Sequence, residues 1–269
     1  MTKRIPIALT IAGSDSSGGA GIQADLKTFA ALGVYGASVI AALTAQNTTG
    51  VAGVFEVPPD FVTAQIDAVF GDLAVDAVKI GMVSCQQTIE AIVAGLTRWS
   101  GQNIVVDPVM IATSGDSLLS PSALDALRVT LIPLARIVTP NLPEAAALLG
   151  EPLARTESEI MGQGERLLRL GCPAALIKGG HGEGPASVDY LFSKEGVVTL
   201  AAPRIATTNT HGTGCSLSSA IAAGLARGES LGEAVRHAKD FISAAIAAAD
   251  RLGVGHGHGP IHHFHAFER

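Results

Sequence analysis

A glycine-rich segment around residue 212 carries the residue types that can hold a phosphate group. It reads Asn209-Thr210-His211-Gly212-Thr213-Gly214-Cys215, and the apolar run 216–225, which predicts a helix, follows directly. The first backbone N–H groups of a helix have no partners inside the helix and point outward, so they can bind an anion. A cysteine at that position lies in a positive field, which predicts a lowered thiol pKa.

Other polar residues follow short β-rich runs along the chain. In an open parallel sheet, ligands bind outside the carboxyl ends of the strands, so residues at those ends are expected to gather along one edge. The residues at the expected strand ends are Gly13-Ser14-Asp15, Gln46-Asn47, Gly81-Met82, Asp107-Pro108-Val109, Asn141 with Glu144, and Lys178-Gly179-Gly180.

This combination favours phosphoryl transfer. The reaction needs donors around developing negative charge, a metal ion that bridges phosphates and a group that accepts the proton of the attacking hydroxyl. Gly212 and Gly214 would supply backbone donors, and Lys178 would neutralise phosphate. Asp107 and Glu144 would hold Mg²⁺ directly or through water. We expect Cys215, as a partial thiolate, to be the base; the alternative is that it only packs below the phosphate.

Two other nucleotide-binding motifs are incomplete. Residues 19–24 match G-x-G-x-x-A, a dinucleotide fingerprint, but that reading also needs an acidic residue at the end of the next strand. The sequence there is Thr44-Ala45-Gln46-Asn47, and no G-x-x-x-x-G-K-[ST] occurs in the chain. NAD binding and a P-loop are therefore disfavoured, and a glycine-rich turn that lets backbone approach any ligand is the alternative.

Composition argues against nucleic-acid and membrane partners. The 269 residues carry a net charge of -6 without a basic run, which favours a small-molecule partner. The uncharged span between Lys27 and Glu56 is interrupted by polar residues, and the apolar part of the N-terminus is too short for a signal peptide. The three cysteines have neither disulfide nor metal spacing, which is typical of the cytoplasm.

Five histidines lie at positions 256, 258, 262, 263 and 265, near the C-terminus. Imidazole is a common zinc ligand, but no cysteine or carboxylate completes a recognisable ligand set. We expect these histidines to dock the tail or to line the edge of the site or of a dimer.

The elements that position these residues alternate between β-rich runs and helical patterns. Strands are predicted at 5–12, 37–44, 77–80, 104–107, 136–139 and 174–178, and a hairpin at 188–192 and 197–201. Helices are predicted at 22–32, 60–70, 86–99, 121–129, 144–149 and 157–170, followed by two closing helices. We therefore expect one α/β domain over residues 1–269, with a mainly parallel sheet between two helical layers and a small antiparallel hairpin at its edge.

Several segments together resemble the hydroxymethylpyrimidine/phosphomethylpyrimidine kinases of thiamin biosynthesis, members of the ribokinase-like superfamily. The resemblance covers nearly the whole chain. It rests on residues 8–29, on Ala45-Gln-Asn-Thr-Thr-Gly, Lys79-Ile-Gly-Met, Thr139-Pro-Asn-Leu-Pro-Glu-Ala, Ile177-Lys-Gly-Gly-His and Asn209-Thr-His-Gly-Thr-Gly-Cys, and on the histidine-rich end.

The resemblance implies a ribokinase-like three-layer fold and two phosphorylations with MgATP: of 4-amino-5-hydroxymethyl-2-methylpyrimidine, then of its monophosphate. Gln46 matches the glutamine that hydrogen-bonds the pyrimidine, and Asp25 a partner of its exocyclic amine. The positions that match the ring lining are Gly13, Met82 and Val109. Asn141 with Glu144 matches the superfamily's N-x-x-E, which organises Mg²⁺ and phosphates. Lys178, Thr210 and Thr213 match the nucleotide side, and we expect a homodimer.

Two other functions stay open on the sequence. A pyridoxal or pyridoxine kinase would share fold and mechanism and differ in the ring that it recognises. A non-catalytic pyrimidine sensor would need no groups that cradle and neutralise phosphate, so Lys178 and the segment around Gly212 argue against it. Gln46, Asp25 and Asp107 have a plainer alternative as well, which is to satisfy buried backbone or to cap a turn.

Overall fold

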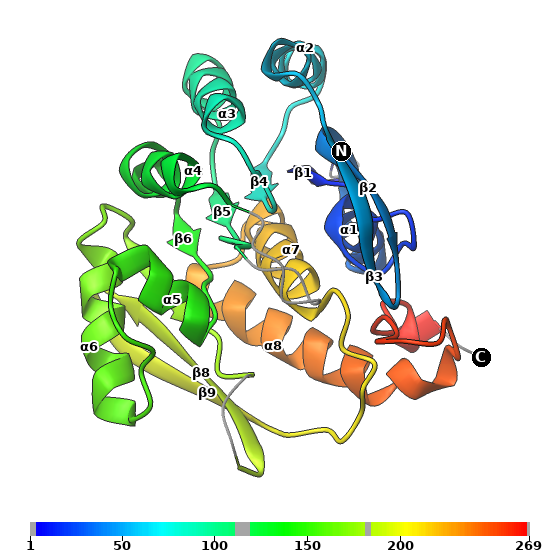
Figure 1. The fold of residues 1–269 in the computed structure, drawn as a ribbon, viewed down its shortest axis with the longest axis vertical. Coiled ribbons are helices and arrows are strands. Elements are labelled where there is room, and N and C mark those ends of the chain that lie inside the picture. Colours follow the sequence, from blue (N-terminus) through cyan, green and yellow to red (C-terminus); the bar gives the residue numbers. More distant parts are fainter. Residues whose placement is uncertain (1–3, 111–118, 181–183, 268–269) are drawn as a thin grey trace.

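Short runs rich in β-branched and small apolar residues form one sheet. The structure, a computed structural model, describes residues 4–110, 119–180 and 184–267, and nine strands of this part form the sheet in the order β3-β2-β1-β4-β5-β6-β7-β8-β9 (Figure 1). Their bounds are β1 Ile7–Gly13, β2 Tyr35–Asn47, β3 Gly50–Glu56, β4 Ala77–Ile80, β5 Ile104–Val106, β6 Ile137–Val138, β7 Ala174–Ile177, β8 Ala186–Ser193 and β9 Gly196–Pro203. The run from β2 to β7 is parallel, while β3, β8 and β9 pair antiparallel at the two edges.

Helices cover both faces of the sheet (Figure 1). One layer consists of α2, α3, α4, α5 and α6, and the other consists of α1, α7 and α8. Their bounds are α1 Gly21–Ala31, α2 Pro59–Phe70, α3 Gln86–Arg98, α4 Pro121–Ala126, α5 Leu142–Leu149, α6 Glu157–Leu168, α7 Thr213–Ala226 and α8 Leu231–Ala247.

Alternate residues of the central strands enter two separate cores. In β1, Leu9 and Ile11 belong to the core beneath α2 and α3, whereas Ala8 faces α1, α7 and α8. In β4, Val78 and Ile80 likewise face the first core. This period of two leaves both faces of the sheet buried, as expected for parallel strands between helical layers.

Local sequence sets the start of two of the helices that reach the site, α5 and α7. Helix α5 begins at a capping box, in which Asn141 Oδ1 accepts from the Glu144 amide at 2.8 Å and Glu144 Oε2 accepts from the Asn141 amide at 2.7 Å. Helix α7 begins after Gly212, whose φ of 79° and close approach to the carbonyl of Gly19 exclude a side chain. Both helix N-termini face the carboxyl ends of the parallel strands.

Three sequence predictions needed correction. Strand β3 was not expected. It is an edge strand with mostly exposed side chains, so its sequence lacks the alternation of apolar and polar residues that a buried face produces. Strand β2 is longer than predicted because it pairs with β3 as far as Asn47. The helix predicted at 121–129 ends at Ala126 and continues as a π-helical turn, Leu127–Leu131, and a 3₁₀ turn, Ile132–Leu134.

No helix in the described part of the chain combines the length and the apolar composition that crossing a bilayer requires.

Candidate active site

A cavity of about 650 Å³ lies at the carboxyl ends of the parallel strands. Its wall includes residues at the ends of four strands: Gly13 ends β1, and Met82, Asp107 and Lys178 follow β4, β5 and β7. Every residue to which the sequence assigned a role in catalysis or binding lines this cavity, except Asp25: Gly13, Gln46, Met82, Asp107, Val109, Asn141, Glu144, Lys178, Thr210, Gly212, Thr213, Gly214 and Cys215. These residues therefore lie together at the carboxyl edge of the sheet, as expected from their positions at strand ends.

One lysine and two carboxylates form the charged centre of the cavity. Lys178 Nζ lies 2.7 Å from Asp107 Oδ1 and 3.6 Å from Glu144 Oε2. The Lys178 side chain is 13% exposed and the Asp107 side chain 1%, so the pair is largely shielded from bulk water. An anionic ligand that entered here would find a cation held in place by two acidic groups.

The two carboxyl groups of this centre have opposite pKa shifts. Burial by itself raises the pKa of Asp107, but the charges of Lys178 and Lys79 outweigh burial and hold that pKa below its ordinary value. For Glu144, burial raises the pKa to about 7, with Asp107 adding repulsion and Lys178 opposing it. Asp107 is therefore the permanently charged member, and Glu144 can exchange a proton near neutral pH.

The first turn of α7 points its backbone toward this centre. The Thr213 amide donates to the Thr210 carbonyl at 3.2 Å, so one of the expected free donors is occupied. The next amides, of Gly214 and Cys215, have no acceptor inside the helix because they belong to its first turn. A side chain at Gly214 would meet Lys178 Nζ at 3.3 Å, which places this turn directly against the lysine.

The thiol of Cys215 differs from the sequence expectation. It lines the cavity, but burial raises its pKa to about 11; Lys79 lowers the pKa, whereas Asp25 and Asp107 raise it further. The prediction of a lowered pKa at the helix N-terminus is thus wrong, because two carboxylates brought from other elements add to the desolvation cost. The thiol carries its proton at neutral pH.

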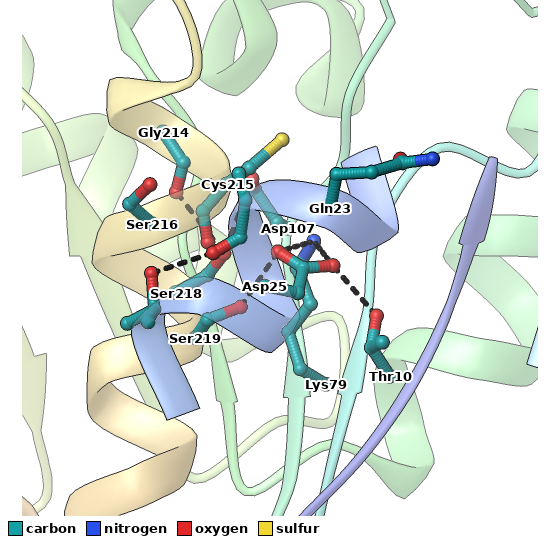
Figure 2. A network of polar contacts seen from close by, with 12 residues as sticks. Thr10, Gln23, Asp25, Lys79, Asp107, Gly214, Cys215, Ser216, Ser218 and Ser219 are labelled. Carbon is teal, nitrogen blue, oxygen red and sulfur yellow. Dashed lines mark hydrogen bonds and ion pairs between the residues drawn. The ribbon is translucent and has the colours of Figure 1, made fainter. Parts of the chain in front are cut away.

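Asp25 does not belong to the cavity wall. Its carboxylate lies 2.8 Å from Lys79 Nζ, 2.6 Å from Thr10 Oγ1 and 2.7 Å from Ser219 Oγ. Figure 2 shows these three side chains around Asp25. The side chains of Asp25 and Lys79 are both 0% exposed. The expectation that Asp25 contacts a ligand is therefore not met: its oxygens are committed to a buried network.

Two residues of the cavity wall, Asp15 and His211, had no role predicted from the sequence. Asp15 Oδ2 lies 2.8 Å from His211 Nε2, although the two residues are 196 positions apart. The Asp15 carboxylate also accepts from the amides of Ser17, Gly19 and Ala20, which closes the glycine-rich loop. For Asp15, the sequence signal was an aspartate at a strand end followed by small residues. For His211, no neighbouring residue indicated a role.

The C-terminal segment docks along the edge of the site. The His211 amide donates to the Gly259 carbonyl at 3.0 Å, and Ser216 Oγ lies 2.8 Å from His263 Nε2. His263 is 4% exposed, and burial, with the charge of Lys27, lowers its pKa to about 4. His263 is therefore a neutral hydrogen-bonding group that ties the tail to the first turn of α7.

Comparison with known proteins places this arrangement among kinases. The family model described as phosphomethylpyrimidine kinase matches residues 15–262. The hydroxymethylpyrimidine/phosphomethylpyrimidine kinase of Salmonella typhimurium is 58% identical over 260 residues, which cover 97% of this chain and 98% of that protein.

Two solved structures share the fold. The ADP complex of Bacillus subtilis pyridoxal kinase matches with a TM-score of 0.91 and 37% identity, over 99% of this chain and 100% of that one. The Staphylococcus aureus pyridoxal kinase with AMP-PCP and pyridoxal matches with a TM-score of 0.90 and 32% identity, over 99% of this chain and 96% of that one. Both similarities extend over almost the full length of the chain.

Proposed function

This chain belongs to the phosphomethylpyrimidine kinase family, and we propose that it phosphorylates hydroxymethylpyrimidine and then its monophosphate in thiamin synthesis. The expectations of a ribokinase-like fold and of a kinase are confirmed. One observation of the structure carries the proposal: the amides at the start of α7, Lys178 and two carboxylates converge on the same cavity as Gln46.

ATP is the phosphoryl donor that the family implies, and its terminal phosphate would lie against the amides of Gly214 and Cys215. Thr210 and Thr213 line the same cavity. Lys178 would balance charge on the transferred group, and its firm attachment to Asp107 means that little reorganisation is needed during the reaction. These residues act by position and charge, which dominate phosphoryl transfer.

Asp107 and Glu144 are suited to hold Mg²⁺. Mg²⁺ sites commonly use one or two carboxylates completed by water and substrate phosphates, and both of these acidic groups line the cavity, each close to Lys178. When bound, the ion would neutralise phosphate charge. Asn141 would act through Glu144, since its side chain and amide hold that residue in the capping box.

The ring of the substrate would bind beside Gln46 in the same cavity. Gln46 provides hydrogen-bonding groups there, while Gly13, Met82 and Val109 line the wall. A side chain at Gly13 would overlap the end of Met82, so glycine is needed there for Met82 to pack against the end of β1. We keep these four residues as the proposed ring site and leave out Asp25, whose carboxylate is enclosed.

Cys215 is proposed to pack beside the phosphate without acting as the base. Since its pKa is about 11, Cys215→Ala is expected to keep kcat within about tenfold of the unmodified enzyme, because phosphoryl transfer depends mainly on positioning. Steady-state kinetics against pH measure this. If Cys215 were the base, only the thiolate would react, and kcat would rise about tenfold per pH unit through the neutral range. That slope, together with an inactive alanine variant, would refute the packing role.

A coupled ADP-release assay tests the function itself. We expect ADP release with hydroxymethylpyrimidine and with its monophosphate, and a lower kcat/KM with pyridoxal. Release with pyridoxal alone would identify a pyridoxal kinase, the alternative that the two similar structures raise. Tight pyrimidine binding without ADP release would point to a sensor.

We also propose a homodimer in the cytoplasm. The three cysteines, Cys85, Cys172 and Cys215, are free thiols, which supports a reducing compartment. Sedimentation of the purified protein would test the dimer.

A further inference from the structure

A shielded ion pair lines the cavity near Lys178, and the proposed mechanism gives it no role. Asp189 of β8 and Lys239 of α8 both line the cavity, and Asp189 Oδ2 lies 2.7 Å from Lys239 Nζ. The Asp189 side chain is 5% exposed and the Lys239 side chain 12%. Charges that are withdrawn from water in this way are costly unless they are paired and hydrogen-bonded, so the contacts of the pair indicate its role.

The two oxygens of the Asp189 carboxylate have different partners. Oδ1 accepts from the Gly179 amide at 2.8 Å, and Oδ2 accepts from Lys239 Nζ at 2.7 Å. Lys239 Nζ also donates to Ser187 Oγ at 3.2 Å. A carboxylate forms a stronger hydrogen bond with an amide than a neutral acceptor does. Asp189 therefore fixes the Gly179 amide, and Lys239 balances the charge that Asp189 brings.

Gly179 is the residue that follows Lys178, and its backbone lies against β8. A side chain at Gly179 would overlap the carbonyl oxygen of Val188, so only glycine lets the chain approach the strand here. A further contact, from Arg204 Nη1 to the Gly180 carbonyl at 2.8 Å, is exposed and lies one residue farther from Lys178. The shielded contact from Asp189 thus attaches the residue next to Lys178 to β8.

Other contacts hold the remaining parts of Lys178. Its amide donates to the Pro140 carbonyl at 2.8 Å, and its backbone forms a parallel bridge with Asn141. At the end of the side chain, Nζ lies 2.7 Å from Asp107 Oδ1. A lysine side chain is long and flexible, so the place of its ammonium group also depends on the backbone from which it starts. The Gly179 amide is the contact that fixes this backbone on the side away from β7.

We infer that Asp189 and Lys239 are positioning residues of the proposed kinase: through the Gly179 amide, they hold the backbone of Lys178 so that its ammonium group lies where the transferred phosphoryl group would bind. Neither residue needs to touch a ligand in this role. The inference rests on the proposed function only for the reaction that Lys178 serves, because the contacts among these residues exist without a ligand.

Amide hydrogen exchange tests the contact without any activity measurement. In the ligand-free protein, we expect the Gly179 amide to be protected from exchange. Asp189→Leu should speed its exchange about tenfold or more, the effect of losing one hydrogen bond to a charged group. Unchanged exchange at Gly179 in a folded Asp189→Leu variant would overturn the inference.

Asp76→Leu is the matched control for this measurement. Asp76 also accepts from a backbone amide, that of Ile7 at 2.8 Å, and pairs with a cation, since its Oδ1 lies 2.6 Å from Arg4 Nη2. It directly precedes β4, however, at the amino end of the parallel strands. Its loss should leave both kcat and the exchange of the Gly179 amide unchanged.

Kinetics test the consequence for catalysis. Asp189→Leu is expected to lower kcat about 10²-fold, the effect of a small displacement of one catalytic group. KM for hydroxymethylpyrimidine should not change, because Lys178 is proposed to act on the phosphoryl group. Asp189→Asn combined with Lys239→Met removes both charges but keeps an oxygen that can accept from Gly179. This double variant should return kcat to within about tenfold of the unmodified enzyme, since the remaining bond is only weaker.

The possible outcomes separate positioning from other roles and from failure of the proposed function. If the pair only stabilised the fold, folded Asp189→Leu would keep its kcat, which contradicts the inference. If Lys239 instead bound the nucleotide directly, the double variant would show a raised KM for ATP although Gly179 is protected again, and this also contradicts it. If the unmodified enzyme phosphorylates neither hydroxymethylpyrimidine nor its monophosphate, the proposed function fails, but hydrogen exchange still decides whether Asp189 holds the residue next to Lys178.

Discussion

Replacing Lys178 by methionine is expected to lower kcat about 10³-fold, the upper range for loss of one preorganised group at a developing charge. Lys178 Nζ lies 2.7 Å from Asp107 and against the first turn of α7, where the transferred phosphoryl group is proposed to lie. Burial lowers the pKa of Lys178, but Asp107 and Glu144 outweigh burial and raise it, so the cation is permanent. The ADP-release assay at saturating substrate measures the loss.

The Lys178 experiment needs a control for folding. The substitution leaves Asp107 and Glu144 without their shared cation, so circular dichroism and thermal unfolding should accompany the kinetics. Lys194→Met removes a lysine in the turn between β8 and β9, away from the cavity, and should leave kcat unchanged. A folded Lys178→Met enzyme with kcat within tenfold of the unmodified one would remove Lys178 from the proposed mechanism.

Replacing Lys79 by methionine is expected to cost about 3–5 kcal/mol of the free energy of unfolding, the usual loss when one partner of a buried ion pair is removed. Lys79 Nζ lies 3.0 and 2.8 Å from the two oxygens of Asp25, and both side chains are 0% exposed (Figure 2). Burial lowers the pKa of Lys79, but Asp25 outweighs burial and raises it. Urea unfolding of the variant gives the loss directly.

A second variant separates the unpaired charge from general disruption of packing. Lys79→Met combined with Asp25→Leu removes both charges, so it should recover part of the stability lost by Lys79→Met alone. Recovery is expected to be incomplete, because the Thr10 and Ser219 hydroxyls then lose their acceptor. A double variant less stable than Lys79→Met would show that the unpaired charge of Asp25 is not the cause of the lost stability.

Much of the fold and of the site was predictable because its signals are local. Helix α5 begins within two residues of the prediction, since Asn141 and Glu144 satisfy each other across one turn. Lys178 was expected at a strand end and follows β7 directly. Strand β3 was missed because an exposed edge strand shows no alternation of apolar and polar residues.

The sequence by itself determined most of the residues that meet at the carboxyl edge of the sheet, because strand ends and helix starts are set by neighbouring residues; it missed His211 and wrongly added Asp25. Only the tertiary structure decided the protonation states and the contact partners of those residues. The Cys215 thiol holds its proton, Asp25 faces Lys79 and not a ligand, and His211 is hydrogen-bonded to Asp15. Each of these properties depends on charge and solvent exclusion supplied by distant segments, and no pattern of neighbouring residues encodes them.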